Sequence, residues 1–418
     1  MFDKLNKKDK EILEIVKKEA KRQKECLDLI ASENYAPKGV MDLLGSILTN
    51  KYSEGYPEKR YYPGNENYDK IEILAQKRAR GIFNLKEEDW GVNVQAYSGA
   101  IANMAVYFSV LNSGDKILSM DLTAGGHLSH GSKVSATGKL FEVYHYGVDK
   151  DYDIDYKDFE KIAKRIKPKM IVSGASAFAK RIDFGRIGKI AKEVGAWHLA
   201  DISHYAGLIV GGVYPSPFGF SDFVMSTTHK SLFGPRGAVI YMNKKSQLAK
   251  NQEKDLVSLL NKSVFPGLQG GPHNNTIGAM AHGFWLASKP EAKKYYKQVL
   301  KNSKFLCAEM KKRGFEIVGE YTESHMFLVN VRKLGLNGKE AEKILEKSNI
   351  LANRNTIYRD ESPLKPSAIR IGTYAVTARG MKEKEMIKIA EMIKIALSKN
   401  ERGEFVKKEI LKLSKKFI

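Results

Sequence analysis

Apolar side chains near the start of the chain follow a helical spacing. Between residues 9 and 30 they recur about every three to four positions, with lysines between them, at Ile12, Leu13, Val16, Ala20 and Leu27. This spacing predicts an amphipathic helix. Because charged residues dilute its apolar stripe, we expect the helix to pack on a partner subunit rather than lie on a membrane. We predict an N-terminal helical arm over residues 1–40.

From about Trp90 onward, short apolar runs alternate with helical stretches. The runs predict strands at 91–95, 116–120, 170–173, 197–202, 223–226 and 238–242, with helices at 100–111 and 186–194. Such alternation indicates a mainly parallel sheet covered on both faces. After Gly283 the pattern changes to lysine-rich helices with strands at 316–319, 326–331 and 369–372, and helices at 382–398 and 404–415. We predict an α/β fold with a large domain over residues 41–283 and a smaller α/β domain over residues 284–418.

Residues 50–68 show neither the helical spacing nor the strand-like alternation of apolar residues. Five tyrosines, two prolines and two glycines lie there, and Pro57 and Pro63 break any regular ladder. A long loop inside a compact domain is usually functional or disordered, and tyrosine rings tend to pack. The pattern predicts an ordered functional loop.

Composition narrows the class of protein. The 418 residues are 43% hydrophobic and 28% charged, which is typical of a globular protein and excludes collagen and coiled-coil rods. Two cysteines are too few for a disulfide framework or a cysteine-rich zinc site. No run of about 18 uncharged apolar residues occurs, and the lysine-rich start lacks the apolar centre of a signal peptide. We expect a soluble, cytoplasmic protein without a membrane partner.

The net charge of +22, from 70 Lys and Arg against 48 Asp and Glu, first suggests nucleic acid as a partner. The most basic stretches, 161–169 and 407–416, alternate with apolar residues at helical spacing, which is typical of a solvated helix face. We therefore predict no nucleic-acid partner, and assign part of the charge to steering small anionic ligands.

In an open α/β sheet, ligands bind at the carboxyl ends of the strands. Tyr97-Ser98-Gly99-Ala100 opens a helix whose free N–H groups could hold an anion, although a helix capped by Ser98 is the simpler explanation of this segment alone. Asp201 ends an apolar strand. It could orient His204, bind a metal, hold a protonated ring nitrogen or cap the following helix.

Two more polar segments are candidates for a ligand site at the carboxyl ends of the strands. Lys230, preceded by Ser226-Thr227-Thr228-His229, fits a desolvated amine with a lowered pKa, which attacks carbonyl groups. His127 and His130 lie between glycines, and without a third ligand they are weak evidence for a metal. A histidine ring facing a cofactor fits equally well, and we predict no metal. Together, an anion cradle, a strand-end aspartate and a lysine form the set that pyridoxal phosphate requires.

Longer motifs extend this set along nearly the whole chain. They are Leu29-Ile30-Ala31-Ser32-Glu33-Asn34-Tyr35, Thr49-Asn50-Lys51-Tyr52-Ser53-Glu54-Gly55-Tyr56-Pro57, Arg60-Tyr61-Tyr62, Thr228-His229-Lys230, Gly234-Pro235-Arg236-Gly237, Phe265-Pro266-Gly267-Leu268-Gln269-Gly270-Gly271-Pro272 and Ile369-Arg370-Ile371-Gly372-Thr373. In these motifs the chain closely resembles the serine hydroxymethyltransferase family, in an archaeal-type form. The resemblance implies a homodimer with shared active sites and a fold-type I pyridoxal 5'-phosphate enzyme with a seven-stranded, mainly parallel sheet. It also implies reversible transfer of the serine hydroxymethyl carbon to a reduced pterin, leaving glycine.

The resemblance further implies residue roles. Lys230 would bind the cofactor covalently, Asp201 would pair with its pyridine nitrogen, and His127 would stack on its ring, with Thr227 and His229 nearby. Glu54 of the partner subunit would be the acid–base group at the hydroxymethyl. Further cofactor contacts would come from Ser98, Gly99, Ala100, Ser176 and His204, and from Tyr52, Gly270 and Gly271 of the partner subunit. The substrate would be bound by Ser32, Tyr62, Arg236 and Arg370, since a guanidinium fork reaches both carboxylate oxygens.

Departures from the family pattern concern the phosphate and the pterin. Ala100 replaces a serine, which removes one phosphate hydroxyl, and Leu268 replaces a glycine. The resemblance places the pterin against Leu122, Gly126, His127, Leu128, Asn355, Ser362, Pro363 and Leu364. Because Leu364 replaces an aromatic residue, we hypothesise that tetrahydromethanopterin, or a related carrier, is the acceptor in place of tetrahydrofolate.

Two related activities share most of these residues. A threonine or allothreonine aldolase would use the same core chemistry without a pterin. An enzyme acting on an amino acid attached to tRNA would use the positive charge, but Arg370 calls for a substrate with a free carboxylate.

Overall fold

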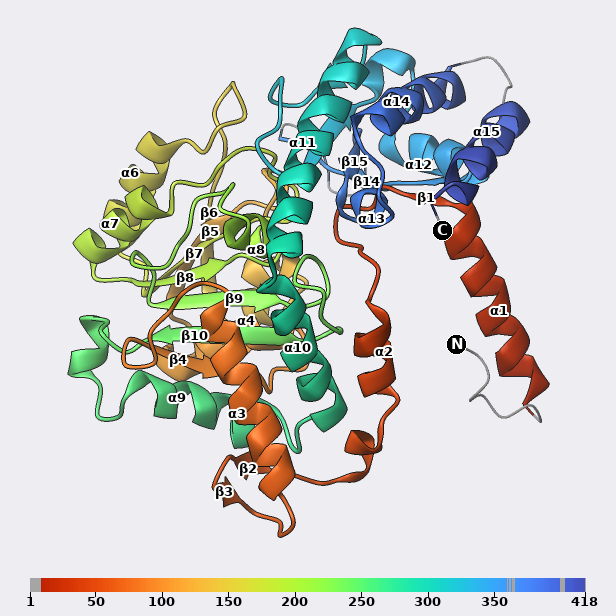
Figure 1. The fold of residues 1–418 in the computed structure, drawn as a ribbon. Coiled ribbons are helices and arrows are strands. Elements are labelled where there is room, and N and C mark those ends of the chain that lie inside the picture. The colour runs from red at the N-terminus through yellow and green to blue at the C-terminus, as the bar shows by residue number, and fades with distance from the viewer. Residues whose placement is uncertain (1–8, 359, 361, 363–364, 399–402, 418) are drawn as a thin grey trace.

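The computed structural model describes residues 9–398 and 403–417, except 359, 361, 363 and 364. A seven-stranded sheet forms its centre (Figure 1). The strands lie in the order β4 (Trp90–Asn93), β10 (Ala238–Asn243), β9 (Phe223–Thr227), β8 (Trp197–Asp201), β7 (Met170–Ser173), β5 (Lys116–Met120) and β6 (Glu142–Tyr146). Only β10 runs against the others, since its pairings with β4 and β9 are antiparallel and the remaining pairings are parallel. The predicted mainly parallel α/β sheet is confirmed.

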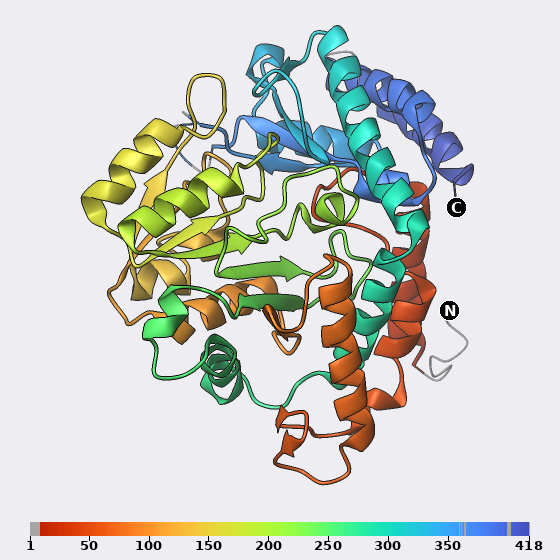
Figure 2. The ribbon, with the colours of Figure 1, turned by 60° about the vertical axis from the view of Figure 1, so that its left-hand side comes forward.

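Helices cover both faces of this sheet, as Figure 2 shows. Alternate side chains of a strand point to opposite faces, so Ile117 and Leu118 of β5 enter different cores. On the Ile117 face lie α4 (Gly99–Val110) and α9 (Leu256–Lys262). The opposite face is covered by α3 (Glu66–Gly81), α6 (Tyr156–Ile166), α7 (Phe184–Val194), α8 (Ala206–Val210) and α10 (Asn274–Ala287).

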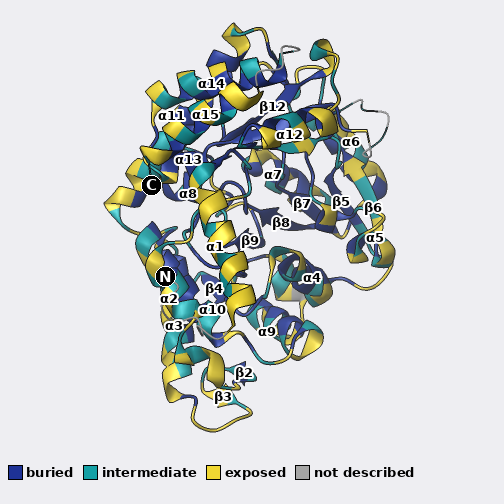
Figure 3. Ribbon diagram, turned by 90° about the vertical axis from the view of Figure 1, so that its right-hand side faces the viewer, coloured by how far each residue is buried: buried dark blue, intermediate teal, exposed yellow. Residues whose placement is uncertain are grey.

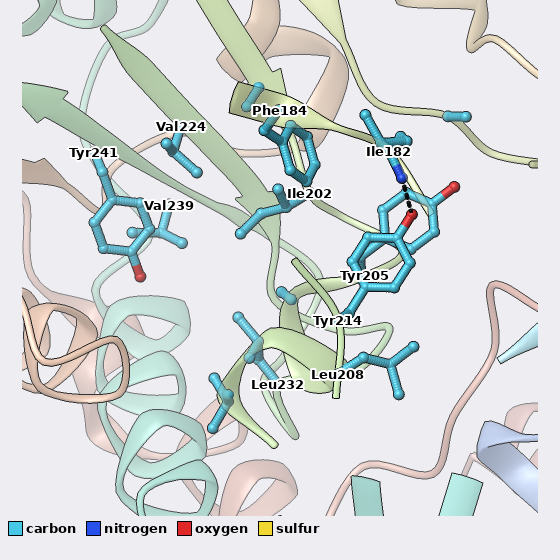
Figure 4. Packing of buried hydrophobic residues seen from close by; sticks show 14 of the residues in the cluster. Ile182, Phe184, Ile202, Tyr205, Leu208, Tyr214, Val224, Leu232, Val239 and Tyr241 are labelled. Carbon is cyan, nitrogen blue, oxygen red and sulfur yellow. Dashed lines mark hydrogen bonds between the residues drawn. The ribbon is translucent and has the colours of Figure 1, made fainter. Parts of the chain in front are cut away.

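The core on the Leu118 face of the sheet is close-packed and contains buried tyrosines whose hydroxyl groups form hydrogen bonds (Figure 4). Tyr205 and Tyr214 stack with ring centroids 4.5 Å apart. The backbone N–H of Ile182 donates to the Tyr214 hydroxyl at 3.1 Å. This packing fixes the end of β8 that carries Asp201.

A four-stranded antiparallel sheet follows in the C-terminal part, in the order β11 (Glu316–Ile317), β12 (Met326–Asn330), β15 (Ala368–Gly372) and β14 (Asn353–Asn355). The helices around it are α11 (Pro290–Lys312), α12 (Gly338–Lys347), α13 (Tyr374–Ala378), α14 (Glu383–Leu397) and α15 (Gly403–Lys415). β1 (Leu27–Asp28) pairs with β13 (Ile350–Leu351), so Leu27 and Leu29 join this core. The domain limits at residues 40 and 283 stay a prediction.

The predicted N-terminal helix is α1 (Lys10–Glu25), which has no buried residue. It contacts α15 and leaves Ile12 and Ile15 exposed, and Figure 3 shows its teal and yellow surface. The chain continues through α2 (Lys38–Leu44) to the loop at 50–68. Within the described residues, no helix has the length and apolar character that crossing a membrane requires.

The tyrosine-rich loop is more regular than its sequence predicts. It contains a hairpin of β2 (Gly55–Tyr56) and β3 (Lys59–Arg60), and α3 already begins at Glu66. Gly55 and Glu58 adopt positive φ angles of 95° and 64°. A Cβ on Gly55 would lie 2.3 Å from the Lys59 carbonyl oxygen, so the turn requires glycine there. The remaining short helical segments are η2 (Ile47–Asn50), η3 (Leu128–His130), α5 (Ala136–Leu140), η4 (Leu248–Asn251), η5 (Ser263–Leu268) and η6 (Arg332–Leu334).

Candidate active site

A cavity of about 490 Å³ lies at the carboxyl ends of β8 and β9, beside the N-terminus of α4. It collects most of the predicted site residues. They are Ser32, Ser98, Gly99, Ala100, His127, Ser176, Asp201, His204, Thr227, His229, Lys230, Arg236 and Arg370. Arg370 belongs to β15, so the cavity is closed on one side by the second sheet.

Lys230 lies three residues after β9 and reaches this cavity. Burial lowers the pKa of its amine to about 8, with help from the charges of Arg370 and Arg236, while Asp201 acts in the opposite direction. A larger fraction of the amine is therefore unprotonated near neutral pH than for an exposed lysine. That is the form in which an amine attacks a carbonyl.

Asp201 is the buried carboxylate at the end of β8. Its Oδ2 accepts hydrogen bonds from His130 Nε2 at 2.9 Å and from Asn103 Nδ2 at 3.1 Å. Burial acts to raise the pKa of Asp201, but the hydrogen bond and charge of His130 and the charge of Lys230 outweigh it, so the pKa lies well below its usual range. Asp201 is a fixed anion, able to hold a proton on a ring nitrogen in the cavity.

His127 is held as a neutral ring at the cavity wall. The backbone N–H of Ser129 donates to its Nδ1 at 3.1 Å, which places the ring proton on Nε2. Burial, with His130 nearby, lowers the pKa of His127 to about 4. An uncharged imidazole can lie flat against a conjugated ring without opposing a positive charge on it.

His204 is oriented by His325, whose Nε2 lies 3.2 Å from His204 Nδ1 and also 3.2 Å from the Ala31 carbonyl oxygen. A carbonyl only accepts, so His325 Nε2 carries the proton and His204 Nδ1 is the acceptor. Burial lowers the pKa of both rings, that of His325 to about 3, so both are neutral. His204 therefore carries its proton on Nε2, where it can be donated.

The segment Ser98-Gly99-Ala100 forms the N-terminus of α4, a twelve-residue helix. Thr227 adds a buried hydroxyl that has no hydrogen-bond partner among the described residues. A Cβ on Gly99 would lie 2.7 Å from Thr227 Cγ2, so glycine leaves the space beside that hydroxyl open. A helix N-terminus with an unsatisfied hydroxyl beside it fits a phosphate group.

Arg370 is fixed deep in the cavity wall. Its Nη1 donates to the Ser176 carbonyl at 2.6 Å, its Nε to Asn353 Oδ1 at 3.1 Å and its Nη2 to Ser32 Oγ at 3.4 Å. Burial lowers its pKa to about 10, and it stays a cation at neutral pH. A buried cation with a hydroxyl beside it suits a carboxylate ligand. Arg236 lines the same cavity from an exposed position.

Five predicted residues do not line this cavity and form a second cluster. They are Tyr52, Glu54, Tyr62, Gly270 and Gly271. The rings of Tyr52 and Tyr62 are 5.1 Å apart and are 57% and 42% exposed. A Cβ on Gly271 would lie 3.2 Å from the Tyr52 ring, and one on Gly270 would lie 3.3 Å from Glu54 Oε1. The resemblance assigned Tyr52, but not Tyr62, to the partner subunit's site. In the structure the two tyrosines lie side by side.

A neighbouring cavity of about 350 Å³ shares His127, Ser176 and Arg370 with the first. Of the predicted pterin contacts, Leu122, Gly126, His127, Leu128 and Asn355 line it. Ser362 does not line it, and Pro363 and Leu364 lie outside the described residues. Arg354 also lines it and pairs with Glu342.

Asn103, His325 and Arg354 line these cavities or support their residues but were not predicted from the sequence, and no local pattern marks them. His130 was considered only together with His127, from its position three residues later between glycines. The described residues contain no group of three or more His, Cys, Asp or Glu side chains arranged to hold a metal.

Comparison with known proteins adds two findings. A family model described as Serine hydroxymethyltransferase matches residues 5–393. A protein of Methanosarcina barkeri (strain Fusaro / DSM 804) named Serine hydroxymethyltransferase is 50% identical over 404 residues, covering 96% of this chain and 95% of that protein.

Proposed function

The chain belongs to the serine hydroxymethyltransferase family, and from that premise we propose that the larger cavity binds pyridoxal 5'-phosphate together with the amino-acid substrate. The seven-stranded, mainly parallel sheet agrees with the fold-type I class of such enzymes. The activity is that of a serine hydroxymethyltransferase, which interconverts serine and glycine. The observation that carries the proposal is the meeting of Lys230 and Asp201 in one cavity with the N-terminus of α4.

The side chains fit each part of the cofactor. Bound pyridoxal phosphate would supply a conjugated ring that spreads the negative charge left on the substrate α-carbon when a bond to it breaks. Asp201 would keep a proton on the pyridine nitrogen, and His204 Nε2–H would donate to the phenolic oxygen. Lys230 would bind the aldehyde carbon, and α4 with Thr227 would hold the phosphate.

The substrate would be held by its carboxylate. Arg370 is already anchored on Ser176 and Asn353, so its guanidinium is oriented before binding. Ser32 Oγ accepts a hydrogen bond from Arg370 Nη2, and its hydroxyl would add a second donor for the substrate carboxylate. Orientation in advance reduces the entropy lost on binding.

The second cluster, Tyr52, Glu54, Tyr62, Gly270 and Gly271, would act in the cavity of a partner subunit in a homodimer. Its tyrosines are exposed, and its residues do not line the cavity of their own chain. Glu54 would then serve as the acid–base group at the substrate hydroxymethyl, and the two glycines and Tyr52 would reach the phosphate.

Shared sites predict complementation. Glu54→Gln and Lys230→Ala homodimers should both be nearly inactive. Random reassociation of the two chains should restore about a quarter of wild-type activity, because half the dimers then contain one complete site of two. The control pairs Lys230→Ala with Asp201→Asn, which damage the same cavity and should stay inactive after mixing. Sites complete within one chain would give no gain from the first mixture.

The neighbouring cavity would take the reduced pterin, since it shares His127, Ser176 and Arg370 with the larger cavity. We propose tetrahydromethanopterin as the carrier, on the ground of the Leu364 departure.

The carrier is tested by steady-state rates of serine cleavage. We expect kcat/KM to be higher with tetrahydromethanopterin than with tetrahydrofolate. A clear preference for tetrahydrofolate would refute the carrier assignment. Full-rate serine cleavage without any pterin would instead point to an aldolase.

A further inference from the structure

Arg60 holds the backbone carbonyls of the two residues that flank Glu54. Its Nη1 donates to the Ser53 carbonyl at 2.9 Å and to the Gly55 carbonyl at 2.8 Å. We propose that Arg60 is the positioning residue that presents Glu54 to the partner subunit's cavity. This inference rests on the proposed function, in which Glu54 acts across a dimer.

The same guanidinium is fixed to α3 by two carboxylates. Its Nε donates to Asp69 Oδ1 at 2.8 Å and its Nη2 to Glu72 Oε2 at 2.6 Å. The side chains of Arg60 and Glu72 are only 4% and 2% exposed. Four hydrogen bonds from one planar group define the hairpin's place on α3, which a flexible ammonium could not do.

Gln95 ties this arrangement to the central sheet. It lies two residues after β4, and its Nε2 donates to the Gly55 carbonyl at 3.0 Å and to Glu72 Oε1 at 2.9 Å. The Gly55 carbonyl thus accepts from both Arg60 and Gln95. The hairpin is therefore attached to two rigid elements, α3 and the end of β4.

The Glu54 side chain contrasts with its backbone. The Glu54 carbonyl accepts from the Tyr61 N–H at 3.0 Å, so the main chain is held on that side as well. Within the described part of the chain, no hydrogen bond is made to the Glu54 carboxylate. A fixed backbone that carries an unengaged carboxylate is the arrangement expected of a group that acts on a ligand supplied from elsewhere.

Arg60→Lys is the first test, because it keeps a cation beside Glu72 but loses the fork that reaches both carbonyls. We expect kcat to fall about 10- to 100-fold with little change in the KM for serine, the cost of misplacing a catalytic group by about 1 Å. Amides of residues 53–61 in the cofactor-free protein should exchange hydrogen faster than in the wild type. Arg80→Lys is the matched control: Arg80 lies on α3 and pairs with Glu87, and among the described residues it makes no ion pair with the hairpin, so activity and exchange should be unchanged.

Mixing of chains separates positioning from general folding. Arg60→Lys mixed with Lys230→Ala should regain activity, since the second chain supplies a well-held Glu54 to the first chain's intact cavity. Arg60→Lys mixed with Glu54→Gln should gain nothing. If Arg60→Lys folds poorly, the double variant Arg60→Met with Glu72→Gln removes both buried charges and is tested in the same mixtures.

Three results would overturn the inference: wild-type kcat in Arg60→Lys, unchanged amide exchange at the hairpin, or no recovery with Lys230→Ala although Glu54→Gln recovers with it. Failure of Glu54→Gln itself to recover with Lys230→Ala would overturn the shared site, and this inference with it.

Discussion

Lys230→Ala should lose the visible absorbance of protein-bound cofactor and lower kcat by more than about 10³-fold, since loss of a proton-transfer group alone costs about 10²–10⁴-fold. The side chain is the one amine among the predicted cavity residues, so its removal leaves no group there to bind the cofactor aldehyde. Absorbance after addition of pyridoxal phosphate and gel filtration measures the loss. Lys180→Ala is the control, because Lys180 is also buried but pairs with Asp153 away from the cavity. An unchanged spectrum in Lys230→Ala would refute the assignment of Lys230.

The lowered pKa of Lys230 adds a pH test to the same prediction. Only the unprotonated amine attacks an aldehyde, so attachment should become faster as pH rises. With a pKa of about 8, the rate should reach half its maximum near pH 8 in the cofactor-free wild-type protein. A midpoint near that of an exposed lysine, about 10.4, would show that the amine is not desolvated.

The fold was largely predictable because buried parallel strands leave continuous apolar runs. β6 was missed, and its sequence explains why: it is the edge strand, and Glu142, Tyr144 and His145 interrupt any apolar run. The hairpin at 55–60 was missed because the hydrogen bonds of Arg60 to Asp69 and Glu72 hold it, and its own residues show no alternation of apolar and polar side chains. These contacts join Arg60 to polar side chains 9 and 12 positions further along the chain, and no spacing of apolar residues records them.

The site residues also divide into those that the sequence predicts and those that only distant contacts bring together. Residues directly after strands, such as Asp201 and Lys230, follow from the rule that ligands bind at the carboxyl ends of strands. His325 lies 121 residues from His204 in the chain, and its role depends on the Ala31 carbonyl brought in from the N-terminal segment. No spacing in the sequence encodes such a contact. Motif resemblance supplied the second cluster, which the chain's own cavity does not include.

Asp201→Asn is expected to keep the fold and lose most of the activity. An asparagine oxygen can still accept from His130 and Asn103, while its amide nitrogen then faces the Ser203 N–H that donates to Asp201 Oδ1 at 3.0 Å, so one buried hydrogen bond is lost. The neutral amide lacks the negative charge that would hold a proton on the pyridine nitrogen. Loss of one such electrostatic contribution typically lowers kcat about 10²–10³-fold, and we expect at least that.

The comparison with Asp222→Asn makes the result specific. Asp222 lies just before β9 and accepts from the backbone N–H of His198 at 2.8 Å, outside the cavity. Its replacement should lower the thermal unfolding temperature without a comparable loss of kcat. Asp201→Asn should show a large loss of kcat in a protein that still unfolds cooperatively above the assay temperature. Equal kcat in wild type and Asp201→Asn would mean that the ring nitrogen needs no carboxylate here. Restored activity in Asp201→Glu would show that the charge, rather than the length of the side chain, is what the cavity requires.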